Sequence, residues 1–220
     1  EELLESLFTL QELTPKSLAK VSSYGEILSS KIIFQILKYA NQDVVFKDAR
    51  ELLYTHEVND REVINQTKSE QACKDFFNKE TAEVVLLPGF IATDENEEIT
   101  NLGRGGSDYT AALIANYIDA SILEIWTDVS GMYTAHPNLV SQALPIPFLS
   151  YNEAMELSHF GAKVIYPPTI QPVLRKEIPI VIKNTFQPED SGTLITKETS
   201  INKPVKGISH IEDISLVTLE

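Results

Sequence analysis

The pattern of hydrophobic and polar positions predicts that the chain begins with helices. Apolar residues recur at helical spacing in residues 3–13 and again in residues 15–40, with Pro15 at the junction of the two segments. On the longer helix, one row of apolar side chains is spaced four residues apart, and we expect this row to face the core. The row consists of Tyr24, Leu28, Ile32 and Ile36.

Farther along the chain, short apolar runs alternate with helical segments. The predicted strands are residues 44–46, 84–87, 122–127 and 178–182. The predicted helices are residues 61–77, 109–118, 151–161 and 165–175. Continuous apolar strands separated by helices are typical of a parallel sheet that is covered on both faces. The pattern therefore predicts an α/β fold, a three-layer αβα sandwich with a mainly parallel central sheet, over residues 1–197.

Composition and charge exclude several classes of function. The 220 residues carry a formal net charge of −14, which argues against binding nucleic acid, because phosphate neutralisation needs a basic face. No apolar run is long enough to span a bilayer, so no membrane partner is expected. The single cysteine, Cys73, lies in a helical pattern and is predicted to be a buried structural thiol, which fits a reducing cytoplasm.

Residues 103–108, Gly-Arg-Gly-Gly-Ser-Asp, carry the strongest chemical signal. Glycines let backbone amides approach a ligand closely, and Ser107 or Asp108 can cap a following helix, whose N-terminus favours an anion. Arg104 adds a planar donor suited to a carboxylate or phosphate. A tight strand-to-helix turn needs the same glycines and is the open alternative, but such a turn does not need the arginine.

Other candidate ligand residues lie on both sides of this loop. Asp128 and Tyr133 follow a predicted strand, at the edge where α/β sheets bind ligands, although Asp128 could equally cap a turn. Lys163 could reach phosphates, and Glu26, which shares a helix face with serines, could hold an ammonium group. Taken singly, a solvated surface residue is the simpler interpretation of Lys163 and Glu26. The four histidines have no metal-ligand spacing, so no metal-binding side chains are predicted.

Together, four segments resemble the aspartate kinases of the amino acid kinase superfamily. They are residues 24–29, 100–111, 126–133 and 160–164, in the family's order and at about its spacing. Similarity continues through residues 182–185 and 192–195. The resemblance implies the amino acid kinase fold and an enzyme that transfers the γ-phosphoryl group of ATP to the β-carboxylate of L-aspartate. The product would be 4-phospho-L-aspartate, and the reaction would be the first step of lysine, threonine and methionine biosynthesis.

The resemblance also implies roles for individual residues. Asp108 and Arg104 would be catalytic, with Asp108 orienting active-site lysines. The substrate pocket would consist of Glu26, Arg104, Gly105, Gly106 and Ser107. The nucleotide would contact Thr127, Asp128, Tyr133, Asn138, Lys163 and Val164. Mg²⁺ is expected together with ATP, because the phosphoryl oxygens need neutralisation.

The chain departs from the family pattern at two places. Family members begin with a strand and a Lys-Phe-Gly-Gly segment whose lysine contacts the transferred phosphoryl group. This chain lacks the segment, so we expect it to be nearly inactive alone. Asn138 stands where the family usually has an arginine and cannot supply that charge. The alternatives are another amino acid kinase, acting on glutamate, N-acetylglutamate or a nucleotide monophosphate, and a non-catalytic pseudo-kinase that only binds ligand.

Both ends of the chain are expected to continue into a longer protein, since Glu1 already lies in a helical pattern and Glu220 in an apolar alternation. Residues 198–206 are polar and predict a linker. Residues 207–220 resemble the first strand of the family's regulatory ACT domain. The resemblance implies a homodimer or larger homo-oligomer formed through ACT domains, with lysine or threonine as feedback effector. A fusion to homoserine dehydrogenase stays open.

Overall fold

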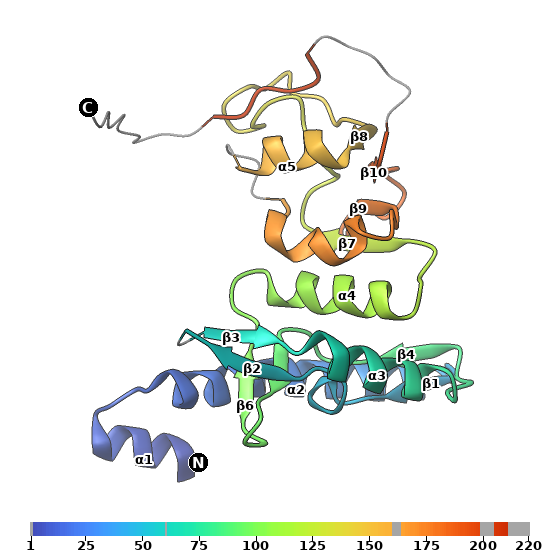
Figure 1. Ribbon diagram of the computed structural model, residues 1–220. Helices are drawn as coiled ribbons and strands as arrows, with labels where there is room; N and C mark the ends of the chain where they lie inside the picture. The colour runs from blue at the N-terminus through green and yellow to red at the C-terminus, as the bar shows by residue number, and fades with distance from the viewer. Residues whose placement is uncertain (1, 60, 160–163, 199–204, 211–220) are drawn as a thin grey trace. The chain divides into compact units, whose positions relative to one another are not determined.

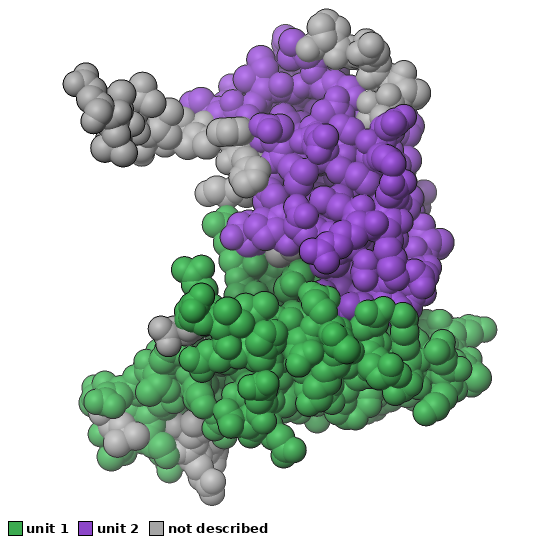
Figure 2. Space-filling model, in the orientation of Figure 1, with its two compact units in different colours: residues 1–110 green, residues 111–220 purple. Residues whose placement is uncertain are grey.

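The computed structural model describes residues 2–59, 61–159, 164–198 and 205–210. The chain divides into two compact units, residues 1–110 and residues 111–220, which Figure 2 colours separately. The predicted catalytic domain, residues 1–197, is thus divided after Thr110. Within the described ranges, no helix is both long and apolar enough to cross a membrane.

The first unit combines helices with short paired strands (Figure 1). Its helices are α1 (Glu2–Leu10), α2 (Pro15–Tyr39), the 3-10 turn η1 (Ala49–Glu51), α3 (Gln66–Phe77) and the start of α4 (Gly106–Tyr117). Its strands are β1 (Val44–Phe46), β2 (Thr55–Val58), β3 (Arg61–Ile64), β4 (Val84–Leu86), β5 (Ile91–Thr93) and β6 (Ile99–Asn101). β1 and β4 are parallel, whereas β2 with β3 and β5 with β6 form antiparallel hairpins.

Helix α2 buries its small side chains instead of its large ones. The row predicted to face the core, Tyr24, Leu28, Ile32 and Ile36, is 49–61% exposed, so that prediction was wrong. The buried residues of α2 are Ala19, Ser23 and Ser30. Helix α2 packs on β1 and β6, and small side chains allow this close approach. The hydroxyls of Ser23 and Ser30 donate to backbone carbonyls of their own helix at 2.7 Å, so their burial leaves no polar group unpaired.

The helix predicted over residues 61–77 begins only at Gln66. The side chain of Asn65 accepts a hydrogen bond from the backbone amide of Lys68 at 3.1 Å, which caps α3 at that point. Residues Arg61–Ile64 instead pair with β2, and Asn59 adopts a positive φ of 51° beside the hairpin turn. The cap and the turn residue together explain why the first turn of the predicted helix is a strand.

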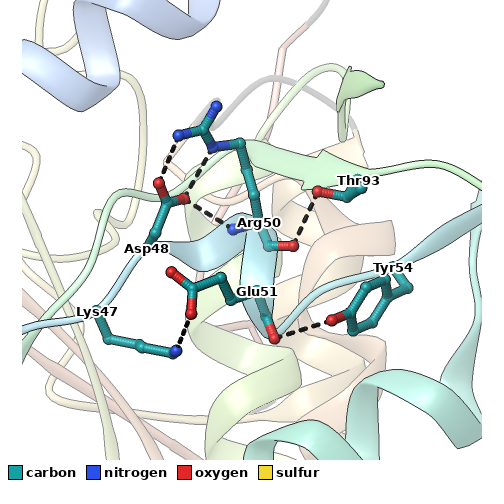
Figure 3. A network of polar contacts seen from close by, with 6 residues as sticks. All are labelled: Lys47, Asp48, Arg50, Glu51, Tyr54 and Thr93. Atoms are coloured by element: carbon teal, nitrogen blue, oxygen red, sulfur yellow. Dashed lines mark hydrogen bonds and ion pairs between the residues drawn. The ribbon is translucent and has the colours of Figure 1, made fainter. Parts of the chain in front are cut away.

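A network of polar contacts surrounds η1 and reaches strand β5 (Figure 3). The carboxylate of Asp48 accepts hydrogen bonds from the Nε and Nη2 atoms of Arg50 at 2.9 and 2.5 Å. Lys47 forms an ion pair with Glu51, and the hydroxyl of Thr93 donates to the carbonyl of Arg50 at 2.8 Å. The Thr93 hydrogen bond attaches the strand that directly follows Phe90 to η1.

The second unit is built on a four-stranded sheet in the order β7-β9-β10-β8. Its elements after α4 are β7 (Leu123–Thr127), β8 (Phe148–Ser150), α5 (Tyr151–His159), η2 (Pro167–Ile170), α6 (Gln171–Leu174), β9 (Ile180–Asn184) and β10 (Thr193–Thr196). The pairs β7–β9 and β8–β10 are parallel, and β9–β10 is antiparallel. The core packs Leu123, Ile125, Leu149, Ile180, Ile182 and Ile195 of this sheet against Leu157 and Val173.

The predicted α/β class is confirmed, but the sheet is more divided than expected. Within the described residues the strands form four hydrogen-bonded sheets instead of one central sheet. Prolines interrupt the helix predicted over residues 165–175, which becomes η2 followed by α6. Cys73 is fully buried, and burial raises the pKa of its thiol to about 12, as expected for a structural thiol. Residues 205–210 have no regular secondary structure, and the predicted strand of residues 207–220 lies largely outside the described residues.

Candidate active site

The first unit contains a pocket of about 280 Å³ at the start of α4. Ligand pockets range from about 300 to 1,000 Å³, so this pocket suits a small molecule better than a nucleotide. Seven residues line it: Glu26, Phe90, Gly103, Gly105, Gly106, Ser107 and Asp108. Five of them belong to the glycine-rich segment that the sequence singled out, and Glu26 comes from α2.

The glycine loop owes its shape to two residues in the left-handed region. Gly103 and Gly105 each have φ of +69°, a conformation that residues with a Cβ rarely adopt. The amide of Gly106 donates to the carbonyl of Gly103 at 3.0 Å, and α4 begins there. A Cβ atom on Gly106 would lie 2.7 Å from the ring of Phe90, so glycine is required for this packing. The loop therefore presents the N-terminus of a 12-residue helix to the pocket.

Two carboxyl groups line the same pocket. Glu26 is half-buried on α2, where the hydroxyls of Ser29 and Ser30 donate to its backbone carbonyl at 3.1 and 2.7 Å. Asp108 lies in the first turn of α4, and burial raises the pKa of its carboxyl. The pocket thus combines negative side chains with the electropositive end of a helix.

Phe90 is the pocket residue that the sequence did not reveal. Its φ of +70° is unusual for a bulky residue. Its amide donates to the hydroxyl of Thr110 at 3.0 Å, and its carbonyl accepts from the amide of Leu102 at 2.8 Å. The sequence signal available for Phe90 was the Pro88-Gly89 pair that precedes it after β4. Glycine is needed at position 89, because a Cβ atom there would lie 2.9 Å from the Cα of Ser107. These contacts hold the β4–β5 connection against the glycine loop.

Arg104 lies on the glycine loop but is not one of the residues that line the pocket. Its side chain is exposed, although its two neighbours in sequence, Gly103 and Gly105, both line the pocket. Of the residues predicted to bind substrate or to act in catalysis, Glu26, Gly105, Gly106, Ser107 and Asp108 thus line one pocket, whereas Arg104 lies at its rim.

The predicted nucleotide contacts lie in the second unit. Thr127 ends β7, and its hydroxyl donates to the carboxylate of the exposed Asp128 at 3.2 Å. Tyr133, half-buried, pairs with Pro145 through an isolated bridge. Asn138 is exposed farther along the same connection. Val164 is half-buried, and Lys163 lies outside the described residues.

No cluster of three acidic, histidine or cysteine side chains that could hold a metal ion occurs among the residues the structure describes.

Comparison with known proteins relates this arrangement to one family. The amino acid kinase family matches residues 3–184. The bifunctional aspartokinase/homoserine dehydrogenase of Buchnera aphidicola is 34% identical over 221 residues, which cover 100% of this chain and 27% of that protein. The lysine-sensitive aspartokinase 3 of Escherichia coli is 33% identical over 225 residues, covering 100% of this chain and 50% of the relative.

A solved structure agrees with the sequence comparison. The crystal structure of E. coli aspartokinase III in complex with aspartate and ADP superposes with a TM-score of 0.80 and 33% identity, covering 90% of this chain and 46% of that one. The chain thus spans between about a quarter and a half of the length of these relatives.

Proposed function

Because the chain belongs to the amino acid kinase family, we propose that it carries catalytic machinery of an aspartate kinase. Such an enzyme transfers the γ-phosphoryl group of ATP to the β-carboxylate of L-aspartate and gives 4-phospho-L-aspartate and ADP. The observation that carries the proposal is the small pocket of the first unit, which combines the carboxylate of Glu26 with the amides of a glycine loop. Aspartate has the complementary groups, one ammonium and two carboxylates.

Aspartate would bind through its charged groups. Glu26 would accept hydrogen bonds from the α-ammonium group, and the amides of Gly105 and Gly106 with the hydroxyl of Ser107 would donate to a carboxylate. Arg104, at the rim, would add a bidentate contact by turning its side chain inward. The small volume of the pocket agrees with a ligand of this size.

ATP would bind at the carboxyl end of β7 in the second unit. Asp128 follows that strand directly and could accept a hydrogen bond from a ribose hydroxyl, and Thr127 and Tyr133 would complete this side of the nucleotide. Lys163 and Val164 would contact the phosphates and the nucleoside. Asn138 can donate a hydrogen bond but cannot replace a cationic side chain.

The chemistry needs positioning more than acid–base catalysis. A free aspartate side chain has a pKa of about 3.9, so the attacking carboxylate is already deprotonated at neutral pH. Asp108 would therefore orient cationic groups near the reacting atoms instead of removing a proton. The amides at the N-terminus of α4 would stabilise negative charge in the transition state. Mg²⁺, when bound with ATP, would neutralise the phosphoryl oxygens.

Trapping with hydroxylamine tests the proposal. Hydroxylamine converts an acyl phosphate to a hydroxamate, so the full-length protein incubated with ATP, Mg²⁺ and aspartate should give aspartyl hydroxamate. Glutamate and N-acetylglutamate serve as the competing substrates. A hydroxamate from one of these two and none from aspartate would overturn the proposal, and no hydroxamate from any substrate would favour a protein that only binds its ligands.

Regulation and assembly belong to the same proposal. The segment beginning at Gly207 would lead into an ACT domain, through which the protein would form a homodimer or larger homo-oligomer and respond to lysine or threonine. A relative, aspartokinase 3 of E. coli, is lysine-sensitive, which makes lysine the first effector to test. A cytoplasmic location stays a prediction.

A further inference from the structure

The loop that carries Asp128 and Tyr133 is joined to the turn between β9 and β10. Strands β7 and β9 are parallel and in register up to Thr127 and Asn184. Beyond this pair, the amide of Thr185 donates to the carbonyl of Thr127 at 2.8 Å. Residues 128–133 and residues 185–192 therefore leave the sheet side by side at its carboxyl edge.

Ser130 forms the first connection between these two segments. Its hydroxyl accepts a hydrogen bond from the side-chain amide of Asn184 at 3.0 Å and lies 2.5 Å from the carboxylate of Asp190, to which it donates. Ser130 and Asn184 are each only 7% exposed. The carbonyl of the Asn184 side chain accepts from the amide of Phe186 at 2.9 Å, so the same residue also shapes the turn.

Thr193 forms a second connection, to Met132, which lies two residues after Ser130 in the loop. Its fully buried hydroxyl accepts from the amide of Met132 at 2.8 Å and donates to the carbonyl of Ile146 at 2.6 Å. Gly131, between the two connections, has φ of +108°, and a Cβ there would lie 2.3 Å from the hydroxyl oxygen of Thr193. The loop is thus fixed on both sides of a glycine that no other residue could replace without moving the backbone.

We propose that Ser130, together with Asn184 and Asp190, forms a set of positioning residues for nucleotide binding. These three side chains are the Ser130 network. The inference rests on the proposed function, because it assigns the nucleotide to the loop that the network holds. Fixing one residue costs about 1–2 kcal/mol of conformational free energy. A loop that is fixed before the nucleotide arrives does not incur this cost on binding.

None of the three side chains of the Ser130 network belongs to the apolar core cluster of the second unit, although Met132 of the same loop does. The network connects the loop after β7 to the end of β9 and to the turn that follows β9, and it does so through side-chain hydrogen bonds. We therefore assign the polar side chains of Ser130, Asn184 and Asp190 to orienting the loop and not to packing the core.

Calorimetry with ADP and, separately, with aspartate tests the inference in the full-length protein. Ser130→Ala should weaken ADP binding about 5- to 30-fold, the factor that corresponds to ordering one residue on binding. The affinity for aspartate should stay unchanged, because the predicted aspartate pocket belongs to the first unit. Ser130→Thr keeps the hydroxyl and should restore ADP binding. Ser141→Ala, at an exposed serine of the β7–β8 connection, is the matched control.

A second pair of variants covers the case in which Ser130→Ala fails to fold. Asp190→Ala removes the acceptor from the half-buried end of the network, and Glu189→Ala removes the neighbouring exposed carboxylate. Only the first should weaken ADP binding. Wild-type ADP affinity in Ser130→Ala and Asp190→Ala, or an equal loss of ADP and aspartate binding, would overturn the inference alone. A wild-type protein that binds no ADP would overturn the proposed function and the inference with it.

Discussion

Asp108 lies in the first turn of α4, and burial raises the pKa of its carboxyl above the ordinary value of 3.8. A raised pKa means that the folded protein binds this proton more tightly than the unfolded chain does. The charged carboxylate therefore destabilises the fold once the pH exceeds the folded pKa, and costs nothing below about 3.8. A residue that weakens the fold at working pH is a candidate for function.

Asp108→Asn should separate stability from activity. We expect the variant to unfold at a higher urea concentration than the wild type at neutral pH, with the difference disappearing below pH 3.8. In the full-length protein, turnover should fall at least about 100-fold, because the groups that Asp108 orients lose their position. Asp75→Asn, on an exposed face of α3, is the control for charge removal. Equal stability of wild type and Asp108→Asn across the pH range would contradict the argument.

Arg104→Ala should weaken aspartate binding and leave ADP binding intact. A hydrogen bond to a charged group contributes about 1.5–3 kcal/mol, which corresponds to about a 10- to 150-fold rise in the Kd for aspartate. Arg104→Lys should recover only part of this affinity, because lysine cannot form the bidentate contact. Calorimetry measures each Kd, and Arg175→Ala, at another exposed arginine, is the control. An unchanged Kd for aspartate would show that Arg104 makes no contact with the substrate.

At the scale of elements, the connection from β4 to β5 depends on one side chain of α4. Thr110 is 3% exposed, and its hydroxyl accepts the hydrogen bond of the Phe90 amide. Thr110→Val keeps the shape but leaves that amide unpaired, so we expect a loss of about 1–3 kcal/mol in the free energy of unfolding. Aspartate affinity should fall as well, because Phe90 lines the pocket.

Urea denaturation and calorimetry check the two effects of Thr110→Val. Thr81→Val, at an exposed position, should change the free energy of unfolding by less than about 0.5 kcal/mol. A Thr110→Val protein that is destabilised yet binds aspartate normally would show that the conformation of Phe90 matters for the fold but not for the pocket.

Elements marked by continuous apolar runs were predicted well from the sequence. Elements whose extent or buried face depends on strand pairing or helix packing were predicted poorly. Strands β1, β4, β7 and β9 lie within about two residues of their predictions, because short runs rich in apolar residues and bounded by polar or turn residues mark them. The strands β5 and β6 are three residues each and contain Thr93, Thr100 and Asn101, so no apolar alternation marked them. Ser23 and Ser30 on α2 are buried because the helix packs closely against β1 and β6. The spacing of apolar residues along the sequence does not predict such packing.

At the scale of the whole molecule, the candidate pocket was predictable because most of it is contiguous in sequence. Residues 103–108 contribute five lining residues, and their glycines and acidic side chain mark them. Phe90 could not be predicted, because its place depends on a positive φ and on packing against Gly106. The links from Ser130 to Asn184 and Asp190 join positions 54 and 60 residues apart, and such contacts exist only once the sheet has formed.

Residues 205–208 are attached to the second unit by contacts that the predicted linker did not suggest. Lys206, with a side chain only 10% exposed, lies 2.8 Å from the carboxylate of Glu153, and the amide of Ile208 donates to the carbonyl of Thr134 at 2.8 Å. Glu153 also accepts from the amide and hydroxyl of Ser150 at 2.7 and 2.9 Å, a capping box at the start of α5. Although burial acts in the opposite direction, the hydrogen bonds from Lys206 and Ser150 lower the pKa of Glu153 below 4.5.

Lys206→Met should therefore destabilise the protein in a pH-dependent way. At neutral pH we expect a loss of about 1–3 kcal/mol. Lys197→Met breaks the exposed pair with Glu177 and should have a much smaller effect, because solvent screens exposed ion pairs. A lowered carboxyl pKa contributes stability that is complete above pH 4.5 and is lost as the pH falls through the folded pKa. The difference between wild type and Lys206→Met should thus be full above pH 4.5 and shrink in more acidic solution. Urea denaturation across this range measures it, and equal, pH-independent effects of both lysine variants would mean that Lys206 makes only a surface contact.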